Sequence, residues 1–458
     1  MDLAGPLFGG VDFIMREAAL FAATGFLILG LSDLAVDLIW LGLRARRLPG
    51  PAAAAPLPRP RRPGRLAIFV PAWDEAAVIG SMLRGAVSAW GEGDWRVYVG
   101  TYPNDPATAA AARAVAGTEA RIRVVTAPGP GPTTKADCLN RLWRALVEDE
   151  GREGHPVKAI VLHDAEDVVH PLELELFDGL IERFDLVQLP VLPLIHPDSR
   201  WLGGHYADEF AESHGKEMVV RGALGAGLPS AGVGCAFSRE ALGRLAAGRG
   251  GLPFEPDSLT EDYELGLRLA EAGGRSAFVR FAAPGGGIVA TREYFPGTLA
   301  ASVRQKARWM TGIALSGWDR LGWSGGAAER WMRLRDRQSL LAAILLCAGY
   351  LALALWLVLK AWQGAGGRGP APVPAALSAL VAANLWLLGW RLAVRAGFTA
   401  SAYGWREGLR AVPRTAIGNL VLVLAAASAL PRYLALRRGG RPRWDKTEHI
   451  FPTRPAAE

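Results

Sequence analysis

The chain has 458 residues, of which half are apolar and 16 are tryptophan, and it carries a formal net charge of +7. Such a composition disfavours a wholly soluble protein, and the length allows about three domains. Three cysteines, Cys138, Cys235 and Cys347, lack pairing or metal-ligand spacing, which argues against a disulfide framework. Because the arginine clusters flank apolar segments and lack interleaved aromatic residues, we expect them to face the cytoplasm and anionic lipid, and we expect no nucleic-acid partner.

The N-terminal region, residues 1–43, is predicted to be a short tail followed by a membrane-spanning helix over 19–43. Asp33 and Asp37 lie one helical turn apart in it, so both must face protein or water. Basic residues follow the apolar stretch, which argues against a cleaved signal peptide. The linker over 44–65 is basic and rich in proline and alanine, so the positive-inside rule places it in the cytoplasm and the N-terminus outside.

Residues 66–321 alternate strand-like and helix-like segments, which predicts a cytosolic α/β domain. The prolines of the last predicted strand indicate an edge position. A polar helix is expected over 205–221. The predicted strands cover 66–70, 95–99, 121–126, 159–162 and 186–194.

The fourth predicted strand ends in three acids, Asp164, Glu166 and Asp167. The carboxyl ends of the strands form the ligand edge of an α/β sheet, and neighbouring carboxylates repel one another unless positive charge lies between them. Mg²⁺ and Mn²⁺ prefer carboxylate oxygens and bring phosphates with them. Taken alone, the cluster fits either a metal site or a solvated acidic turn.

Two later motifs also have a chemical and a structural interpretation. Glu261 and Asp262 open a predicted helix, where the helix start favours an ionised carboxylate, but Glu261 also has capping-box spacing from Ser258. An amphipathic helix presents a donor, a guanidinium and an aromatic ring on one face, able to hold a pyrophosphate and a sugar. A helix lying in the membrane interface is the alternative. The residues on that face are Gln305, Arg308 and Trp309.

The last region, 322–458, is predicted to contain two more spans, over 340–359 and 371–390. A shorter apolar segment over 415–430 is expected to lie in the cytoplasmic interface. With the N-terminus outside, three spans keep the basic tail that begins at Arg432 in the cytoplasm, whereas a fourth span would export it.

The order of the motifs is more informative than any one of them. PAWDEAAVI follows the first strand, HDAED the fourth, TED starts a helix, QKARW lies on the amphipathic helix, and membrane helices follow. This order resembles the D-x-D, T/E-D and Q-x-x-R-W pattern of the membrane-integrated glycosyltransferases of family 2, relatives of cellulose and hyaluronan synthases. YVGTYPNDPAT, GPTTKADCLN and the tail RWDKTEHIFP support the match, which extends from Leu20 to Pro452.

The resemblance implies a role for each position. Asp262 would be the general base. Mg²⁺ or Mn²⁺ would be held by Asp164 together with Glu166 or Asp167, because this chain has Glu166 where the family has its second aspartate. The residues implied to bind the nucleotide-sugar are Pro71, Ala72, Glu75, Asp105, Lys135 and Asp164. Those implied at the pyrophosphate and the acceptor are Glu261, Gln305, Arg308 and Trp309.

The resemblance also implies a GT-A-type fold for 66–321, and an enzyme of the bacterial inner membrane with its catalytic domain in the cytosol. Its activity would be inverting transfer of a sugar from a UDP-sugar donor to a growing or membrane-associated glycan, for the cell envelope or for export through an envelope partner. Inversion needs one carboxylate as base and no second catalytic carboxylate. A non-catalytic envelope or phage-adsorption scaffold with a transferase-like fold is the alternative, against which the intact motifs argue.

Overall fold

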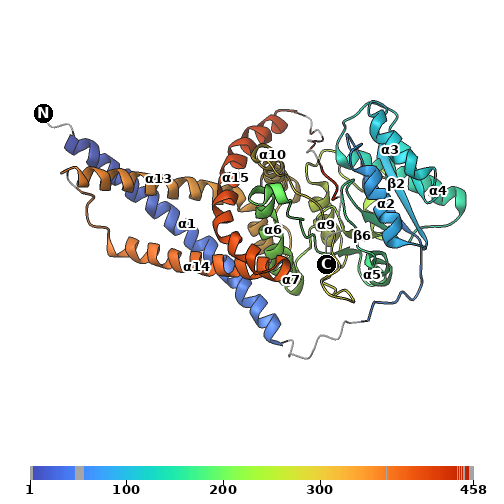
Figure 1. The fold of residues 1–458 in the computed structure, drawn as a ribbon, viewed down its shortest axis with the longest axis horizontal. Coiled ribbons are helices and arrows are strands. Elements are labelled where there is room, and N and C mark those ends of the chain that lie inside the picture. The colour runs from blue at the N-terminus through green and yellow to red at the C-terminus, as the bar shows by residue number, and fades with distance from the viewer. Residues whose placement is uncertain are drawn as a thin grey trace.

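The computed structural model describes residues 4–46, 56–367, 369–440, 442, 444, 446 and 449–452. The centre of the predicted linker, 47–55, and part of the basic tail therefore lie outside the described residues. Figure 1 shows two parts, an α/β domain and a long bundle of helices that projects from it.

The α/β domain is built on a mixed sheet with the strand order β3-β2-β1-β4-β6-β5-β7. The first four strands run parallel, whereas β6 is antiparallel to both of its neighbours. The four parallel strands confirm the predicted ones, and β6 and β7 were not predicted. The strands are β1 (Leu66–Pro71), β2 (Trp95–Thr101), β3 (Ile122–Thr126), β4 (Ala159–Leu162), β5 (Leu186–Gln188), β6 (Cys235–Ser238) and β7 (Ser276–Phe278).

The predicted edge position of the fifth strand is wrong. β5 lies between β6 and β7 and pairs with both. Pro190 and Pro193 come after its last paired residue, where the chain continues only through isolated bridges such as that of Val191 with Thr291. The prolines thus end the strand early, but they do not keep neighbours away from it.

Two apolar cores lie on opposite faces of the sheet. Along β1, Ile68 and Val70 point into one core and Ala67 and Phe69 into the other, as the period of a strand requires. The first core is covered by α2 (Ile79–Trp90), α3 (Pro106–Ala116) and α5 (Glu173–Leu180). The second core is covered by α4 (Lys135–Glu153), α8 (Arg239–Ala247) and α9 (Glu261–Glu271).

Short helices connect the sheet to the bundle. The single helix predicted over 205–221 is interrupted by a π-helical turn, and a second π-helical turn follows α10. The connecting helices are η1 (Pro197–Ser199), α6 (Leu202–Glu212), η2 (Ser213–Glu217), α7 (Met218–Ala223), α10 (Leu299–Trp309), η3 (Met310–Ser316), α11 (Gly317–Leu321) and α12 (Ala327–Arg337).

Four helices in the described part of the chain are long and apolar enough to cross a membrane. Three of them run side by side along the bundle, whereas α15 crosses its base and contacts α6, α10 and α14 (Figure 1). α1 starts at residue 4, so the expected short tail is largely helical, and α15 is longer than the segment predicted over 415–430. The four are α1 (Ala4–Arg46), α13 (Ser339–Gly364), α14 (Ala375–Tyr403) and α15 (Trp405–Arg437).

Asp33 and Asp37 of α1 face protein, as expected. Asp37 is buried, where it pairs with Lys216 of η2 and accepts a hydrogen bond of 2.8 Å from Trp390 Nε1. Asp33 pairs with Arg335 at 2.9 Å and with Arg391 at 2.8 Å. These pairs tie α1 to the connecting helices and to α14, at the end of the bundle next to the α/β domain.

Candidate active site

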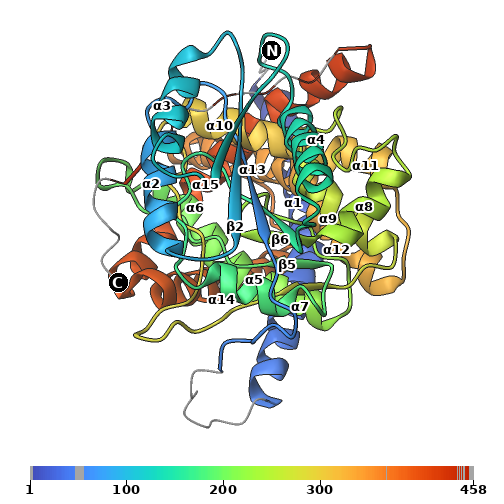
Figure 2. The same ribbon diagram turned by 90° about the vertical axis from the view of Figure 1, so that its right-hand side faces the viewer.

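A cleft lies at the carboxyl ends of β1 and β4, bounded on its other side by α9 and α10. β1 and β4 are adjacent and parallel, so the loops that follow them meet at one edge of the sheet, which Figure 2 views from the domain side. Most of the predicted site residues line this cleft, although they come from distant parts of the sequence. They are Pro71, Glu75, Lys135, Asp164, Glu166, Glu261, Asp262, Gln305, Arg308 and Trp309.

Lys135 supplies positive charge among the acids. Thr134 caps the N-terminus of α4 and so fixes the start of this helix, from which Lys135 Nζ reaches Asp164 Oδ1 at 2.6 Å. Burial alone would lower the pKa of Lys135, but Asp164, Glu261 and Asp262 outweigh it and raise the pKa above its usual value. Lys135 therefore remains protonated and neutralises part of the acidic cluster.

The two candidates for the second metal ligand lie differently. Glu166 lines the cleft, whereas Asp167 does not. Asp167 Oδ2 instead accepts hydrogen bonds from the backbone N of Asp164 at 3.0 Å and from His163 Nδ1 at 2.7 Å. Burial raises the pKa of Asp167 to about 7. Asp167 thus holds the turn after β4 in shape, and of the two acids only Glu166 faces the cleft.

Two residues implied to bind the nucleotide also lie behind the surface of the cleft. Asp105 starts α3, where its carboxylate accepts hydrogen bonds from Thr108 N at 3.3 Å and from Asp74 N at 2.6 Å. Asp74 has a positive φ of 56°, so this bond stabilises a strained turn that presents Glu75 to the cleft. Ala72 is fully buried and extends the sheet through a bond from its N to Gly100 O.

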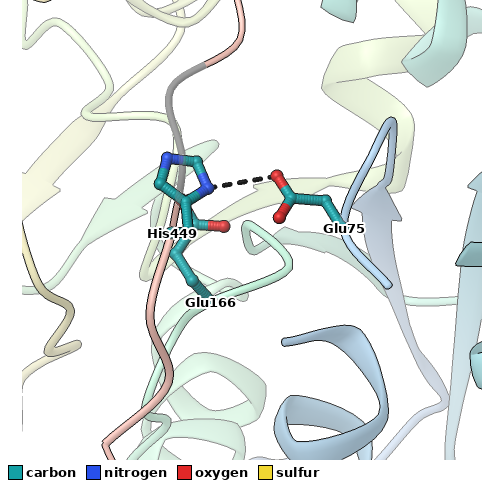
Figure 3. A group of neighbouring side chains, drawn as sticks. All are labelled: Glu75, Glu166 and His449. Carbon is teal, nitrogen blue, oxygen red and sulfur yellow. Dashed lines mark hydrogen bonds and ion pairs between the residues drawn. The ribbon is translucent and has the colours of Figure 1, made fainter. Parts of the chain in front are cut away.

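The tail after α15 returns to the cleft, which the sequence motifs did not predict. Trp444 packs beside Trp73 and donates its backbone N–H to Thr133 O at 3.0 Å. Lys446 pairs with Glu75. His449 Nδ1 lies 3.1 Å from Glu75 Oε1 and 3.0 Å from Glu166 Oε1 (Figure 3). Ligand atoms of these two glutamates and of His449 lie within 4.8 Å of one another, a spacing that could hold a metal ion.

Asp262 lies at the opposite side of the cleft, at the start of α9. Gly232, with a φ of +79°, packs against its carboxylate, and Asp262 Oδ1 accepts a hydrogen bond of 2.7 Å from Tyr263 N. The capping box of Ser258 and Glu261 does not form, because Ser258 Oγ accepts from Thr260 N instead. Burial raises the pKa of Asp262, and it raises the pKa of Glu261 to about 7. The effect of burial on the pKa of these two acids thus outweighs that of the helix N-terminus, which was expected to favour the ionised form.

α10 supplies an aromatic wall next to Asp262. The ring centroid of Trp309 lies 6.3 Å from those of both Phe210 and Phe295, which also line the cleft. Gln305 Oε1 is buried in the same region without a hydrogen-bond partner. These rings are tilted or edge-to-face relative to one another, and aromatic rings beside an unsatisfied amide suit the apolar face and the hydroxyls of a sugar. Sequence reasoning missed the two phenylalanines, which have no motif around them.

Glu293 is a further acid of the cleft that no motif indicated. Burial, reinforced by the nearby charges of Asp167 and Glu166, raises its pKa well above the usual value. A protonated carboxyl at this position donates a hydrogen bond, and it adds no negative charge to the cluster.

A sequence model described as "Glycosyltransferase like family 2" matches residues 63–312. The chain is 35% identical over 490 aligned positions to "Bacteriophage adsorption protein B" of Escherichia coli (strain K12). It is equally similar to "Bacteriophage N4 adsorption protein B" of Escherichia coli O157:H7. Each alignment covers 99% of this chain and 64% of the relative, so the chain spans 64% of the length of these relatives.

The chain is also similar to a solved structure, the mannosyltransferase PcManGT from Pyrobaculum calidifontis in complex with GDP-Man and Mn²⁺. The TM-score is 0.54 at 19% identity, and the match covers 92% of this chain and 99% of that one. At this identity the likeness concerns the fold. It agrees with the mixed sheet and with the cleft at the strand ends, and the expected GT-A-type fold is confirmed.

Proposed function

Since the chain belongs to the glycosyltransferases of family 2, we propose that it transfers a sugar from a UDP-sugar to a glycan acceptor with inversion at the anomeric carbon. The observation that carries the proposal is the gathering of the motif residues around one cleft. Cationic groups and acids lie at one side of it, and Asp262 with the aromatic wall of α10 lies at the other. This division separates a place for the nucleotide from a place for the acceptor.

The nucleotide side suits a diphosphate. Glu75, Asp164 and Glu166 are in contact with cationic side chains of the chain itself, namely Lys135, Lys446 and His449. A leaving diphosphate develops negative charge as its bond to the sugar breaks, so Lys135 and Lys446 are placed to stabilise it. Arg308 lines the same cleft and can contact the diphosphate from α10.

A divalent cation fits the same edge of the sheet. Asp164 and Glu166 present hard carboxylate oxygens to the cleft, and cationic groups already lie against both carboxylates. We propose that these two residues hold Mg²⁺ or Mn²⁺. When bound, the ion would supply positive charge to the diphosphate. Asp167, occupied by His163 and by the backbone of Asp164, has no part in this proposal.

We propose that Asp262 acts as the general base. A pKa raised by burial brings a carboxylate closer to the working pH and makes it a stronger proton acceptor than an exposed aspartate. In the proposed reaction the acceptor hydroxyl gives its proton to Asp262. Its oxygen then attacks the anomeric carbon from the face opposite the diphosphate. Trp309, Phe210 and Phe295 would hold the acceptor sugar by stacking.

We further propose that the acceptor belongs to the cell envelope. The apolar helices of the bundle suit a protein of the inner membrane with its cleft in the cytosol, and the named relatives are phage adsorption proteins. An export partner would then be needed to move a finished glycan outward.

The proposed donor is tested with the purified full chain and a panel of UDP-sugars. GDP-mannose is included in the panel as a further donor. The measurement is the release of UDP from the UDP-sugars and of GDP from GDP-mannose. The Asp262→Asn variant tests the base, because asparagine keeps the shape and removes the proton acceptor. Transfer should fall by ~10²–10⁴-fold, while nucleotide affinity persists because other residues, such as Lys135, Asp164 and Glu75, are proposed to hold the nucleotide. Transfer within about twofold of the wild type would refute the assignment, and UDP release from none of the donors would refute the proposed function.

A further inference from the structure

A second cavity, of about 1080 Å³, lies between the membrane helices. Its walls come from α1, α13, α14 and α15, and most of its lining residues are apolar, chiefly leucine and alanine. At the end next to the α/β domain it is closed by polar residues of α6, α10 and α15. A cavity with an apolar body and a polar end is shaped for an amphiphile.

The polar end contains three side chains with unsatisfied atoms. His205 is 5% exposed, and Asp208 and Arg414 are each 1% exposed. All three line the cavity, and His205 Nε2, Asp208 Oδ2 and Arg414 Nε have no hydrogen-bond partner. Such buried groups are costly unless a ligand satisfies them.

The chain is shaped to keep Arg414 at this end. A Cβ on Gly204 of α6 would lie 2.6 Å from Arg414 Nε, so only glycine lets the guanidinium lie against this helix. Arg414 is also fixed by a contact of 3.0 Å to Asp208 Oδ1. The unsatisfied atoms therefore belong to a rigid arrangement.

The chemistry of these atoms favours a head group with hydroxyls. His205 Nδ1 donates to Leu202 O, so Nε2 is an acceptor. Burial, aided by the charge of Lys306, lowers the pKa of His205 to about 4 and keeps the ring neutral. Asp208 Oδ2 is a second acceptor, and Arg414 Nε is a donor. Hydroxyls can donate to the two acceptors and accept from Arg414, whereas a phosphate would meet two acceptors and could satisfy only the donor.

Positive charge at this end is already balanced. Within the described residues, each cation that lines the cavity here contacts an acid. The pairs are Lys306 with Glu209, Arg391 with Asp33, Arg395 with Glu212, and Arg414 with Asp208. No surplus positive charge is therefore left for an anionic head group. A bare glycan is disfavoured for another reason, since its hydroxyls would face leucine and phenylalanine side chains without partners.

The polar end adjoins the acceptor side of the cleft. Lys306 lies on α10 between the two sites, with its Nζ 5.1 Å from the ring centroids of both Trp309 and Tyr206. Gln305, Arg308 and Trp309 line the cleft, and Lys306 lines the cavity, so α10 forms a wall common to both.

We infer that the cavity binds a lipid with an uncharged, hydroxylated head group, of the glycosyl-diacylglycerol class, and that this lipid carries the acceptor hydroxyl. The inference rests on the proposed function for the transfer step, but binding of the lipid does not depend on turnover. The two can therefore fail separately.

The test measures lipid retention without any donor. The full chain is reconstituted in phosphatidylcholine vesicles that contain monoglucosyl-diacylglycerol, purified again, and the bound lipid is quantified by native mass spectrometry. We expect about one glycolipid per chain. Val381→Trp fills the cavity and should lower retention by about tenfold. Its control is Val358→Trp on α13, an exposed position that does not line the cavity.

The head-group contact is tested by His205→Phe, which keeps a ring and removes the acceptor nitrogen. We expect a loss of retention of about tenfold with unchanged thermal unfolding. Equal retention in Val381→Trp and Val358→Trp would overturn the inference, as would preferential retention of phosphatidic acid from vesicles that contain both lipids. With donor added, labelled sugar should be extracted into butanol, and label found only in water-soluble glycan would equally overturn it. Absence of all transfer with normal retention would count against the proposed function alone.

Discussion

The packing of Gly232 against Asp262 allows the carboxylate of this proposed base to be displaced without changing its chemistry. A Cβ added at Gly232 would lie 3.1 Å from Asp262 Cγ and 3.2 Å from its Cβ, and closer still to Oδ2. Restoring an ordinary contact to that oxygen requires a shift of about 1 Å, and misplacement by this distance costs roughly 10²-fold in rate. Gly232→Ala is therefore expected to lower sugar transfer by about 100-fold.

The matched control is Gly225→Ala. Both glycines have positive φ, +79° at Gly232 and +68° at Gly225, so alanine is strained at either position by about 1–2 kcal/mol. At Gly225 a Cβ would meet nothing within 4 Å. Both substitutions therefore strain the backbone to a similar extent, but only Gly232→Ala displaces the carboxylate of Asp262.

The assay compares initial rates of transfer, nucleotide affinity and thermal unfolding for both variants. Similar unfolding temperatures and affinities together with a selective loss of rate in Gly232→Ala would support Asp262 as the base. If the two variants transfer sugar at rates within about threefold of each other, the position of Asp262 does not govern the reaction, and the assignment is refuted.

Three further outcomes are expected. Transfer should stop in excess EDTA and return with Mg²⁺ or Mn²⁺, and Asp164→Asn should raise the metal concentration needed for half-maximal rate; full activity in EDTA would contradict the metal proposal. Burial lowers the pKa of His214 to about 3, helped by Arg280, so the folded chain excludes a proton that the unfolded chain accepts below its pKa of 6.5. The contribution of His214 to the free energy of unfolding is therefore fully present above pH 6.5. It is lost as the pH falls towards 3, by about 2 kcal/mol at pH 5. His214→Asn keeps an acceptor for Val191 N and should lose less stability between pH 7 and pH 5 than the wild type, and an equal loss would refute this account. A reporter fused after residue 440 should lie in the cytoplasm, as three spans with α15 in the interface require, and an exported reporter would show that α15 is a fourth span.

Sequence patterns predicted the fold and the site best where the evidence lies in residues that are neighbours in the chain. β4 is an apolar run followed directly by acids, so both the strand and its place at the ligand edge could be derived from neighbouring residues. The interior position of β5 could not, because it depends on β6 and β7, which follow much later in the chain. The π-helical turn η2, which places Lys216 beside Asp37, also has no local pattern.

The return of the tail to the cleft also could not be predicted from local patterns, because it depends on contacts with distant parts of the chain. Trp444, Lys446 and His449 lie in a short polar segment with no periodicity, and only the resemblance of RWDKTEHIFP singled it out. Their contact with Glu75 and Glu166 joins residues more than 270 positions apart. The sequence left Glu166 and Asp167 open as metal ligands for a different reason: the hydrogen bonds that hold Asp167 come from its near neighbours His163 and the Asp164 backbone, and they depend on the shape of the turn after β4.

The buried charges of α1 have a consequence for the order in which the protein is made. Asp33 and Asp37 leave the ribosome in the first helix, but their partners Lys216, Arg335 and Arg391 are synthesised much later. Until α14 emerges, α1 must hold two acids that apolar surroundings disfavour. The first helix therefore reaches its final depth in the membrane only late in synthesis, and a chain that stops before α14 would leave Asp33 without Arg391 and Asp37 without Trp390.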